Sequence, residues 1–460
     1  MTTEPCVPTR EELEVGASRP EEKSLRLHAF YQGKMQVVPK CPISDAGDLA
    51  YWYTPGVSAP CRAIQVDRSR VYELTNKSNS IAVVSDGSRV LGLGNIGPYA
   101  GLPVMEGKAL LFKYLGGVDA VALCLGTQDE REFVRTVQLL EPAFGAINLE
   151  DIAQPRCFRV LEELRKTMPI PVWHDDQQGT ATALLAGLIG ALKVVGKRID
   201  SIRIAMIGMG AANVASYRLL KAYGVSPAQI VACDSRGTLH RGRLDIEEQQ
   251  TEFPEKWLVC QESNPEAVTG GIEQALHRAD VCIAFARPDP GLIQAAWVRA
   301  MAHNAIVFAC ANPMPEIWPW DAKAAGARIV ATGRNDFRNQ VNNSLVFPAI
   351  LRGTLDARAV TISDEMAMAA AIELARCAEQ RGLTDEAILP SMLDSWVVPR
   401  VAAATATRSQ ELGLARVTRT REEYIESASH RITESQRMLK VLMREGVIAE
   451  LPKPIREITH

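Results

Sequence analysis

The chain has 460 residues, of which 47% are hydrophobic and 23% charged, and its formal net charge is −3. This balance is typical of a globular protein with roughly two to four domains, and it gives no sign of a basic surface for nucleic acid or anionic membranes. The ten cysteines include no CxxC pair, which argues against a zinc ribbon and fits a reducing compartment. The glutamate-rich N-terminus does not resemble a signal peptide, and the longest uncharged apolar-rich run, 177–192, is shorter than the ~20 residues that span a bilayer. We therefore expect a soluble, cytoplasmic protein.

The first part of the chain predicts an α/β domain over 25–178, after a loose polar segment over 1–24. Residues 81–85 and 118–125 are short apolar runs typical of buried strands. The pattern becomes helical over 128–168, with a break at the sequence NLEDIAQP. A further helix is expected after the sequence HDDQQGT (174–180) and should end near Gly196.

The middle of the chain predicts a Rossmann-type domain over 179–376. Apolar runs at 203–208, 230–234, 281–285, 305–310 and 328–332 alternate with helical stretches. Such alternation indicates a doubly wound parallel sheet. Residues 377–460 are expected to form a helical C-terminal region, in which Thr420 and Glu423 make a possible capping box.

A glycine-rich turn, GMGAAN (208–213), follows the first of these runs and opens a helix. Gly208 would allow a tight turn, and Gly210 would let the backbone approach a pyrophosphate at the helix N-terminus. Asn213 stands where this fingerprint has glycine or alanine, so we expect the helix and the strand to be slightly further apart there. Asp234, at the end of the next strand, could bind an adenosine ribose, while Arg236 could meet a 2′-phosphate or be solvated. The pattern predicts a nucleotide site and leaves NAD versus NADP open.

Four carboxylates, those of Glu150, Asp151, Asp175 and Asp176, lie near two turn-like segments. Like charges raise one another's pKa, so bringing these groups together is costly unless a divalent cation binds them. Because the available ligands are all oxygens, Mg²⁺ or Mn²⁺ suits them better than zinc. Glu150 and Asp151 are neighbours in the chain, so both can face one ion only if the backbone is irregular there. The alternative is a pair of solvated acids that cap a helix.

Over about 27–376 the chain resembles the malic enzyme family. The resemblance rests on several motifs that occur in order: WYTPGV (52–57), VVSDGSRVLGLGNIGP (83–98), PVMEGKALLFK (103–113), FGAINLEDIAQPRCF (144–158), VWHDDQQGTA (172–181), CANPMPEI (310–317) and TGRNDFRNQVNNSLVFPAILRG (332–353). The overall length and the HDD and RND motifs look more like the short bacterial and archaeal branch than the long eukaryotic one.

This resemblance implies oxidation of L-malate at C2 and loss of CO₂ to give pyruvate, with NAD or NADP as coenzyme and Mg²⁺ or Mn²⁺ as the metal. The metal ligands would be Glu150, Asp151 and Asp176. The resemblance also implies an N-terminal substrate and metal domain, an active site in the cleft between the two domains, and a homodimer.

The resemblance further implies Lys108 as the general base for the malate hydroxyl, Asp175 as the carboxylate that hydrogen-bonds it, and Tyr53 as the acid that protonates C3. Burial of Lys108 beside a cation would lower its pKa. Arg89 is either a ligand of the substrate carboxylate or a surface charge. Asn312 and Asn343 would hold carboxylate and carboxamide groups. The coenzyme-binding residues would be Thr180, Gly208, Gly210, Ala211, Asn213, Asp234 and Asn312.

Two other functions are compatible with this scaffold. A malolactic-type enzyme would keep NAD bound and release lactate. A non-catalytic, nucleotide-binding regulatory protein would be expected to lack Lys108, Tyr53 or a carboxylate, and all of these are present. The sequence ARPDP (286–290), near the expected nicotinamide side, replaces the small polar residues usual in the family and bears on coenzyme preference.

Overall fold

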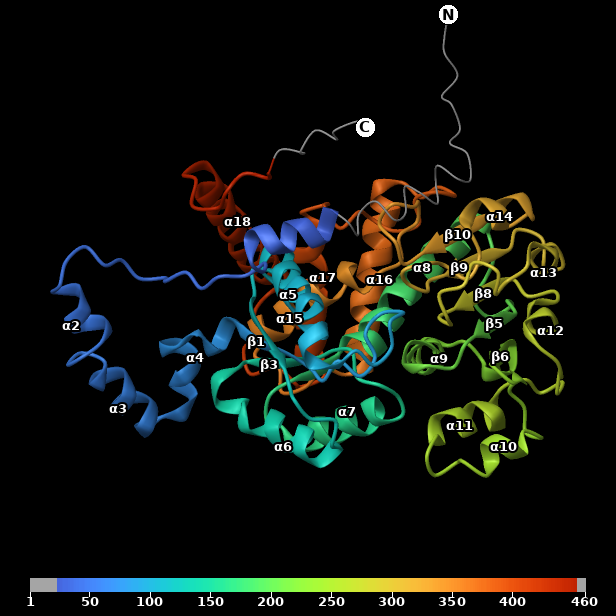
Figure 1. The fold of residues 1–460 in the computed structure, drawn as a ribbon, viewed down its shortest axis with the longest axis horizontal. Coiled ribbons are helices and arrows are strands. Elements are labelled where there is room, and N and C mark those ends of the chain that lie inside the picture. Colours follow the sequence, from blue (N-terminus) through green and yellow to red (C-terminus); the bar gives the residue numbers. More distant parts are fainter. Residues whose placement is uncertain (1–22, 453–460) are drawn as a thin grey trace, which may run out of the picture.

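Two sheets organise residues 23–452, the part of the chain that the computed structural model describes (Figure 1). The segment over 1–24 that was predicted to be loose lies almost entirely outside these residues. The first sheet contains β1 (Ser80–Ser85), β2 (Asp119–Cys124), β3 (Ala146–Leu149) and β4 (Val172–His174), in the order β2-β1-β3-β4. All neighbouring strands run parallel, and helices α5 (Gly97–Gly116), α6 (Glu130–Leu139) and α7 (Arg156–Thr167) connect or flank them.

The first two strands of this sheet confirm the sequence predictions at 81–85 and 118–125. The helical prediction over 128–168 is wrong at 146–147, where β3 begins; this strand continues into the predicted break at NLEDIAQP and is completely buried. A strand of four residues that includes a polar one, Asn148, gives too short a pattern to separate from a helix. β3 is held in the sheet by pairing with β1 and β4, which lie in other parts of the chain, so the local sequence does not reveal it.

An arm precedes this sheet and extends away from it on the left of Figure 1. It comprises residues 36–75 and includes α2 (Asp48–Trp52), α3 (Ser58–Val66) and α4 (Val71–Leu74). None of the residues in α2 and α3, all of them described, is buried within this chain. Helices this short are marginal in water unless an apolar face is covered.

The second sheet has the order β10-β9-β8-β5-β6-β7 and matches all five predicted strands. Its strands are β5 (Ile204–Ile207), β6 (Ile230–Asp234), β7 (Gly237–Thr238), β8 (Val281–Ala284), β9 (Ile306–Ala309) and β10 (Ile329–Thr332), of which only β7, among the residues described, pairs antiparallel. From β5 the chain passes first to β6 on one side and later to β8 on the other. That reversal places a crevice at the carboxyl ends of β5 and β8, where open α/β sheets bind ligands. The associated helices are α9 (Ala211–Tyr223), α10 (Leu244–Glu247), α11 (Pro254–Glu262), α12 (Ile272–Leu276), α13 (Ala295–Arg299) and α14 (Pro319–Ala324).

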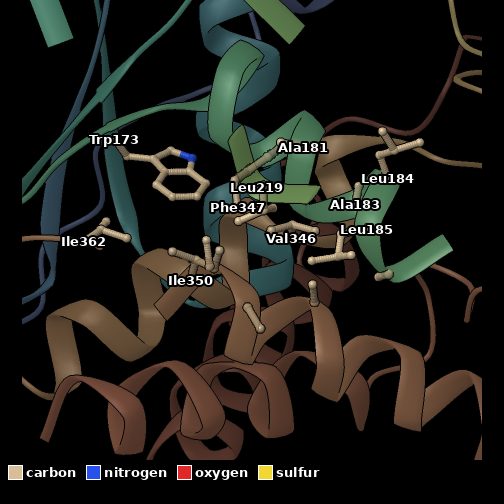
Figure 2. Packing of buried hydrophobic residues seen from close by; sticks show 14 of the residues in the cluster. Trp173, Ala181, Ala183, Leu184, Leu185, Leu219, Val346, Phe347, Ile350 and Ile362 are labelled. Atoms are coloured by element: carbon tan, nitrogen blue, oxygen red, sulfur yellow. The ribbon is translucent and has the colours of Figure 1, made fainter. Parts of the chain in front are cut away.

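The helix α8 (Thr180–Val195) joins the two sheets and ends at Gly196, as predicted, in a left-handed conformation. Together with the turn before it, α8 is long and apolar enough to cross a membrane. However, 78% of this apolar stretch is buried inside the structure. Figure 2 shows Ala181, Ala183, Leu184 and Leu185 of α8 in the same buried cluster as Val346 and Phe347, a cluster that extends to Trp173 in the edge strand of the first sheet. One continuous core therefore runs through both domains at α8.

The C-terminal region consists of α15 (Phe347–Asp356), α16 (Asp364–Arg381), α17 (Val397–Glu411) and α18 (Arg421–Arg444). The predicted domain boundary at 376/377 falls inside α16, which is continuous there. The capping box of Thr420 and Glu423 is present at the start of α18. This last helix returns to the first domain, where Ser435 Oγ donates to the Lys113 carbonyl oxygen at 2.8 Å, at the end of α5.

Candidate active site

A cavity of about 570 Å³ lies between the two sheets. Residues of both domains line it: Lys108, Glu150, Asp151 and Asp176 from the first, and Gly210, Ala211, Phe285 and Ala286 from the second, with Thr180, Asn312 and Asn343 between them. The residues from the second domain lie at the ends of β5 and β8, the crevice that the strand order predicts. The expected cleft between the domains is thus present.

Lys108 lies on α5 and is buried at the first-domain side of this cavity. Its Nζ donates to Asp175 Oδ2 at 2.5 Å and forms an ion pair with Glu150 Oε1 at 2.8 Å. The ammonium also lies 4.2 Å from the centre of the Phe347 ring. Asp175 is held in turn by Trp173, whose Nε1–H donates to Asp175 Oδ1 at 3.0 Å. The contact between Lys108 and Asp175 that the family resemblance implies is therefore present.

Burial and the surrounding carboxylates act in opposite directions on the pKa of Lys108. Burial lowers the pKa of Lys108, but the charges of Asp175, Glu150 and Asp176 outweigh burial and hold it above its ordinary value. The sequence indicated burial correctly, but the number of carboxylates facing the ammonium was settled only by tertiary packing.

The carboxylates of Glu150, Asp151 and Asp176 gather at the end of β3 and the start of α8. Asp151 has a φ of +54°, so the backbone is irregular at this point, as two neighbouring ligands would require. Its N–H donates to Asp176 Oδ2 at 2.8 Å. Burial raises the pKa of Asp151 to about 8, and the charge of Asp176 adds to that effect. Burial likewise raises the pKa of Glu150 and of Asp176.

A π-helical turn, Asp175–Gly179, brings the two aspartates into this group. Such turns are rare and often occur at functional sites. At Gly179 a Cβ atom would lie 1.9 Å from Asp175 Oδ1, so only glycine leaves room for the carboxylate that holds Lys108. The motif HDDQQGT thus contains both the acids and the residue that makes space for them.

The acidic group has the chemistry of a divalent-cation site. Within residues 23–452, Asp151 Oδ2 is a buried carboxylate oxygen with no hydrogen-bond partner. Yet no three His, Cys, Asp or Glu side chains in that range converge as closely as the ligands of a bound ion. Glu150 instead faces Lys108 and accepts a hydrogen bond from Asn148 Nδ2 at 2.9 Å.

The glycine-rich turn forms the coenzyme side of the cavity. Gly208 has a φ of +84°, and a Cβ there would lie 2.7 Å from the Phe285 carbonyl oxygen. Gly210 caps α9, the helix whose N-terminus faces the cavity. Asn213 does not line the cavity: it is buried behind the turn, where its Nδ2 donates to the Ile207 and Gly208 carbonyl oxygens at 3.0 and 2.6 Å. These two hydrogen bonds connect the first turn of α9 to the end of β5.

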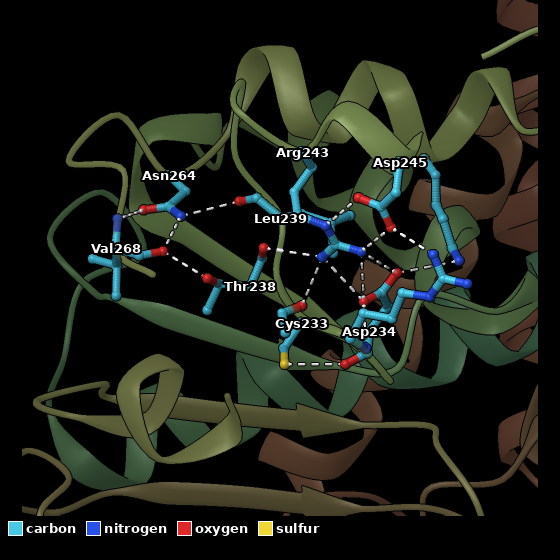
Figure 3. Close-up of polar contacts among 11 residues, drawn as sticks. Cys233, Asp234, Thr238, Leu239, Arg243, Asp245, Asn264 and Val268 are labelled. Carbon is cyan, nitrogen blue, oxygen red and sulfur yellow. Dashed lines mark hydrogen bonds and ion pairs between the residues drawn. The ribbon is translucent and has the colours of Figure 1, made fainter. Parts of the chain in front are cut away.

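Asp234 lies outside the cavity, at the end of β6, within the ionic cluster drawn in Figure 3. Arg89 does line the cavity, although it is exposed. Its Nη1 donates to the Leu91 carbonyl oxygen at 2.7 Å and its N–H to the Asp151 carbonyl oxygen at 3.0 Å. Asn312 and Asn343 line the cavity as predicted.

Tyr53 is not brought to this site by its own chain. It is not among the described residues that line the cavity, and 73% of it is exposed on the arm. The neighbouring side chains of Tyr51 and Trp52 are also largely exposed.

Sequence reasoning overlooked Glu316, which holds the two loops beside the expected nicotinamide position. Its carboxylate accepts hydrogen bonds from the Ala286 N–H at 2.7 Å and the Ala311 N–H at 3.1 Å. Burial raises the pKa of Glu316 to about 7. The residue lies within the motif CANPMPEI, but nothing local distinguishes it from a surface acid. Asn148 and Trp173, which orient Glu150 and Asp175, were also overlooked, because their contacts with these acids depend on the fold.

A Rossmann-type sheet with a glycine turn, facing a buried lysine and carboxylates across a cleft, defines a two-domain dinucleotide-dependent enzyme. Two family descriptions match this chain: "Malic enzyme, N-terminal domain" over 32–165 and "Malic enzyme, NAD binding domain" over 177–408. The chain belongs to the malic enzyme family.

Curated relatives and solved structures agree with this assignment. A bifunctional malic/malolactic enzyme from Bacillus subtilis is 46% identical over 88% of this chain and 97% of its own. An NAD-dependent malic enzyme from Geobacillus stearothermophilus is 45% identical over 84% and 78%. The crystal structure of Entamoeba histolytica malic enzyme matches with a TM-score of 0.94 and 43% identity, covering 97% of this chain and 93% of that one.

Proposed function

We propose that this chain oxidises L-malate and decarboxylates the product to pyruvate, with NAD or NADP as hydride acceptor. The observation that carries the proposal is Lys108, buried among carboxylates and facing the glycine turn across one cleft. A base, an acidic group suited to a cation and a coenzyme turn around one cavity are the parts that this reaction needs.

Each residue around the cavity has a distinct part in this proposal. Lys108 takes the proton of the C2 hydroxyl, and Asp175, fixed by Trp173, orients the lysine and stabilises its ammonium form. Arg89 and the amides of Asn312 and Asn343 bind carboxylate or carboxamide groups without adding negative charge. Thr180, Gly210 and Ala211 contact the coenzyme.

Mg²⁺ or Mn²⁺ fits the acidic group, held by Glu150, Asp151 and Asp176. Support comes from the buried, unpartnered oxygen of Asp151 and from the raised pKa of each carboxyl, because a cation would favour the ionised forms. Such an ion would polarise the hydroxyl and stabilise the negative charge that develops during decarboxylation. Drawing Glu150 away from Lys108 would also lower the pKa of the lysine toward that of a working base.

The test is an assay of the purified protein with L-malate and Mn²⁺, run separately with NAD⁺ and NADP⁺. Reduced coenzyme together with pyruvate is the expected result. Lactate without net reduction of coenzyme would indicate the malolactic function, which the name of the Bacillus subtilis relative makes the second candidate. Absence of turnover with both coenzymes would contradict both functions and favour a regulatory protein.

We also propose that the protein is a homodimer in which the arm packs against a second copy. Large apolar side chains on the arm are open to solvent in the single chain, among them Val37, Val66 and Trp52 at 99%, 90% and 50% exposure. Exposed apolar surface on short helices favours coverage by a partner. A second copy of the chain against the arm would also explain why Tyr53 lies outside the cavity of its own chain, because Tyr53 could then protonate C3 in the cavity of the other copy.

Mixing two inactive variants tests this arrangement. Tyr53→Phe and Lys108→Ala would be unfolded and refolded together, or expressed together, and assayed for malate oxidation. If each site takes Tyr53 from the other copy, mixed dimers contain one intact site, and about a quarter of the wild-type activity returns for random pairing. If Tyr53 acts within its own chain, or not at all, the mixture does not exceed the sum of its parts. Sedimentation of the wild-type protein as a monomer would contradict the dimer directly.

A further inference from the structure

The end of β6 lies directly beside the glycine turn. The strand pairs with β5, and the Gly208 N–H donates to the Cys233 carbonyl oxygen at 2.8 Å. Asp234 is the next residue, so its side chain stands at the edge where the adenosine half of a dinucleotide lies in this fold. In such sheets a free acid at this position accepts a hydrogen bond from the ribose 2′-hydroxyl, and a nearby arginine accommodates a 2′-phosphate.

The carboxylate of Asp234 is already engaged (Figure 3). Its Oδ1 accepts the Arg236 N–H at 2.9 Å and both Nη atoms of Arg243 at 3.2 Å. Its Oδ2 accepts Arg243 Nη2 at 3.2 Å and lies 3.5 Å from Lys256 Nζ. Only 9% of the side chain is exposed. A ribose hydroxyl would have to displace a charged donor to use this acid.

Arg243 is locked in place from the opposite side. Its Nε donates to Asp245 Oδ1 at 2.7 Å and its Nη2 to Asp245 Oδ2 at 2.9 Å. Its Nη1 also donates to the Gly237 and Thr238 carbonyl oxygens. Hydrogen bonds to Asp245 hold the pKa of Arg243 above its ordinary value. This arginine is therefore a fixed, permanently charged neighbour of Asp234.

The residues Asp234, Arg236, Arg243, Asp245 and Lys256 form what we call the β6 cluster. It contains three cations against two carboxylates, so its balance is positive. Arg236 pairs with Asp245 through Nη1 at 3.2 Å, but 67% of its side chain is exposed, so its guanidinium is accessible at this edge. A planar guanidinium with accessible N–H groups suits a phosphate.

We propose that this chain selects NADP⁺ over NAD⁺ because Arg243 occupies Asp234 while Arg236 and Lys256 bind the 2′-phosphate. Arg243 is the positioning residue in this scheme: it removes the acceptor that would bind a 2′-hydroxyl and the negative charge that would repel a 2′-phosphate. The proposal rests on the proposed function only in assuming a dinucleotide coenzyme.

Coenzyme fragments test the choice without the catalytic reaction. The full chain would be titrated calorimetrically, without malate or metal, with adenosine 2′,5′-bisphosphate, adenosine 3′,5′-bisphosphate and 5′-AMP. We expect the 2′,5′ isomer to bind at least about tenfold more tightly than the other two, and its affinity to fall more steeply with added NaCl than that of 5′-AMP. The 3′,5′ isomer has the same charge, so it separates a specific contact from general attraction.

Three variants then locate the selectivity. Arg236→Gln should weaken binding of the 2′,5′ isomer and leave 5′-AMP unchanged. Arg243→Gln should reduce the ratio of the affinity for the 2′,5′ isomer to that for 5′-AMP. The freed carboxylate of Asp234 could accept a hydrogen bond from the 2′-hydroxyl of 5′-AMP, and its negative charge would repel a 2′-phosphate. Arg241→Gln is the matched control in the same loop: Arg241 Nε donates to the Gln261 carbonyl oxygen, outside the cluster, so the ratio should hold.

Equal binding of the three fragments, tighter binding of 5′-AMP, or no binding of any fragment by the wild-type protein would each overturn the proposal. Selective binding of the 2′,5′ isomer without malate turnover would leave this proposal intact and contradict the proposed function instead. Malate turnover with a higher kcat/KM for NAD⁺ than for NADP⁺ would support the proposed function and contradict the proposed selection of NADP⁺.

Discussion

Two groups of charged residues lie on either side of the glycine turn, and they differ in how well their charges are balanced. In the cleft, Lys108 faces the four carboxylates of Glu150, Asp151, Asp175 and Asp176, and burial raises the pKa of every one of these acids. In the β6 cluster a hydrogen bond from Arg243 lowers the pKa of Asp245, and cations are in excess. The first group lacks positive charge and the second can accept negative charge. The comparison teaches that the sign of the imbalance, and not the mere presence of acids, indicates the ligand.

The largest effect on activity should come from removing the ammonium group of Lys108 from the cleft. Lys108→Ala should lower kcat for malate oxidation by about 10²–10⁴, because it removes the general base. Coenzyme affinity, measured by calorimetry, should stay unchanged, since Lys108 lies on the opposite side of the cavity from Gly210. Unchanged turnover would exclude Lys108 as the base.

Removing one acid of the same group should weaken metal binding. Asp176→Asn should raise the Kd for Mn²⁺ by about 100-fold or more, because it removes a charged ligand while the weaker effects of outer groups already reach 10–100-fold. A titration with Mn²⁺, monitored by calorimetry or electron paramagnetic resonance, would measure this Kd. An unaltered titration would remove Asp176 from the proposed ligand set.

The raised pKa values also predict how stability depends on pH. An acid whose pKa is higher in the folded than in the unfolded protein binds more protons when folded, so stability is lost as pH rises through the folded value. For Asp151 that range extends from its unfolded value near 4 to about 8. With a chelator present to remove divalent cations, the free energy of unfolding should fall by up to about 1.4 kcal/mol per pH unit for each proton that only the folded protein binds. Saturating Mg²⁺ should flatten the slope; a slope that ignores Mg²⁺ would mean that these carboxyls do not bind it.

A smaller effect is expected from Asn148, which contacts the cleft group from behind. Asn148→Leu keeps the branching of the side chain but removes the donor to Glu150, and it also removes a buried oxygen that has no partner among the described residues. Affinity for Mn²⁺ should fall roughly tenfold while the unfolding temperature changes little. Loss of stability without loss of metal affinity would assign Asn148 a purely structural part.

The smallest effect should come from the β6 cluster. Asp245→Asn breaks ion pairs with Arg236 and Arg243 that lie near the surface. Because such pairs contribute little, the free energy of unfolding should fall by about 1 kcal/mol or less. Chemical denaturation would measure it; a loss several times larger would show that the β6 cluster supports the fold as well as the coenzyme site.

Sequence alone determined the local parts of this protein. The parallel strands of the second domain, the end of α8 at Gly196, the tight turn at Gly208 and the capping box at Thr420 all follow from short-range periodicity and from the φ values that glycine allows. The motifs placed Lys108 and the four acids in one site, and the cavity contains or adjoins all of them.

Only the tertiary structure decided how these residues affect one another. It paired Lys108 with two carboxylates that raise its pKa, placed the Asn213 side chain behind the coenzyme turn, and engaged Asp234 with Arg243. It also placed Tyr53 on an exposed arm, away from the cavity of its own chain. Burial and electrostatic coupling depend on distances between segments far apart in the sequence, and no local pattern contains those distances.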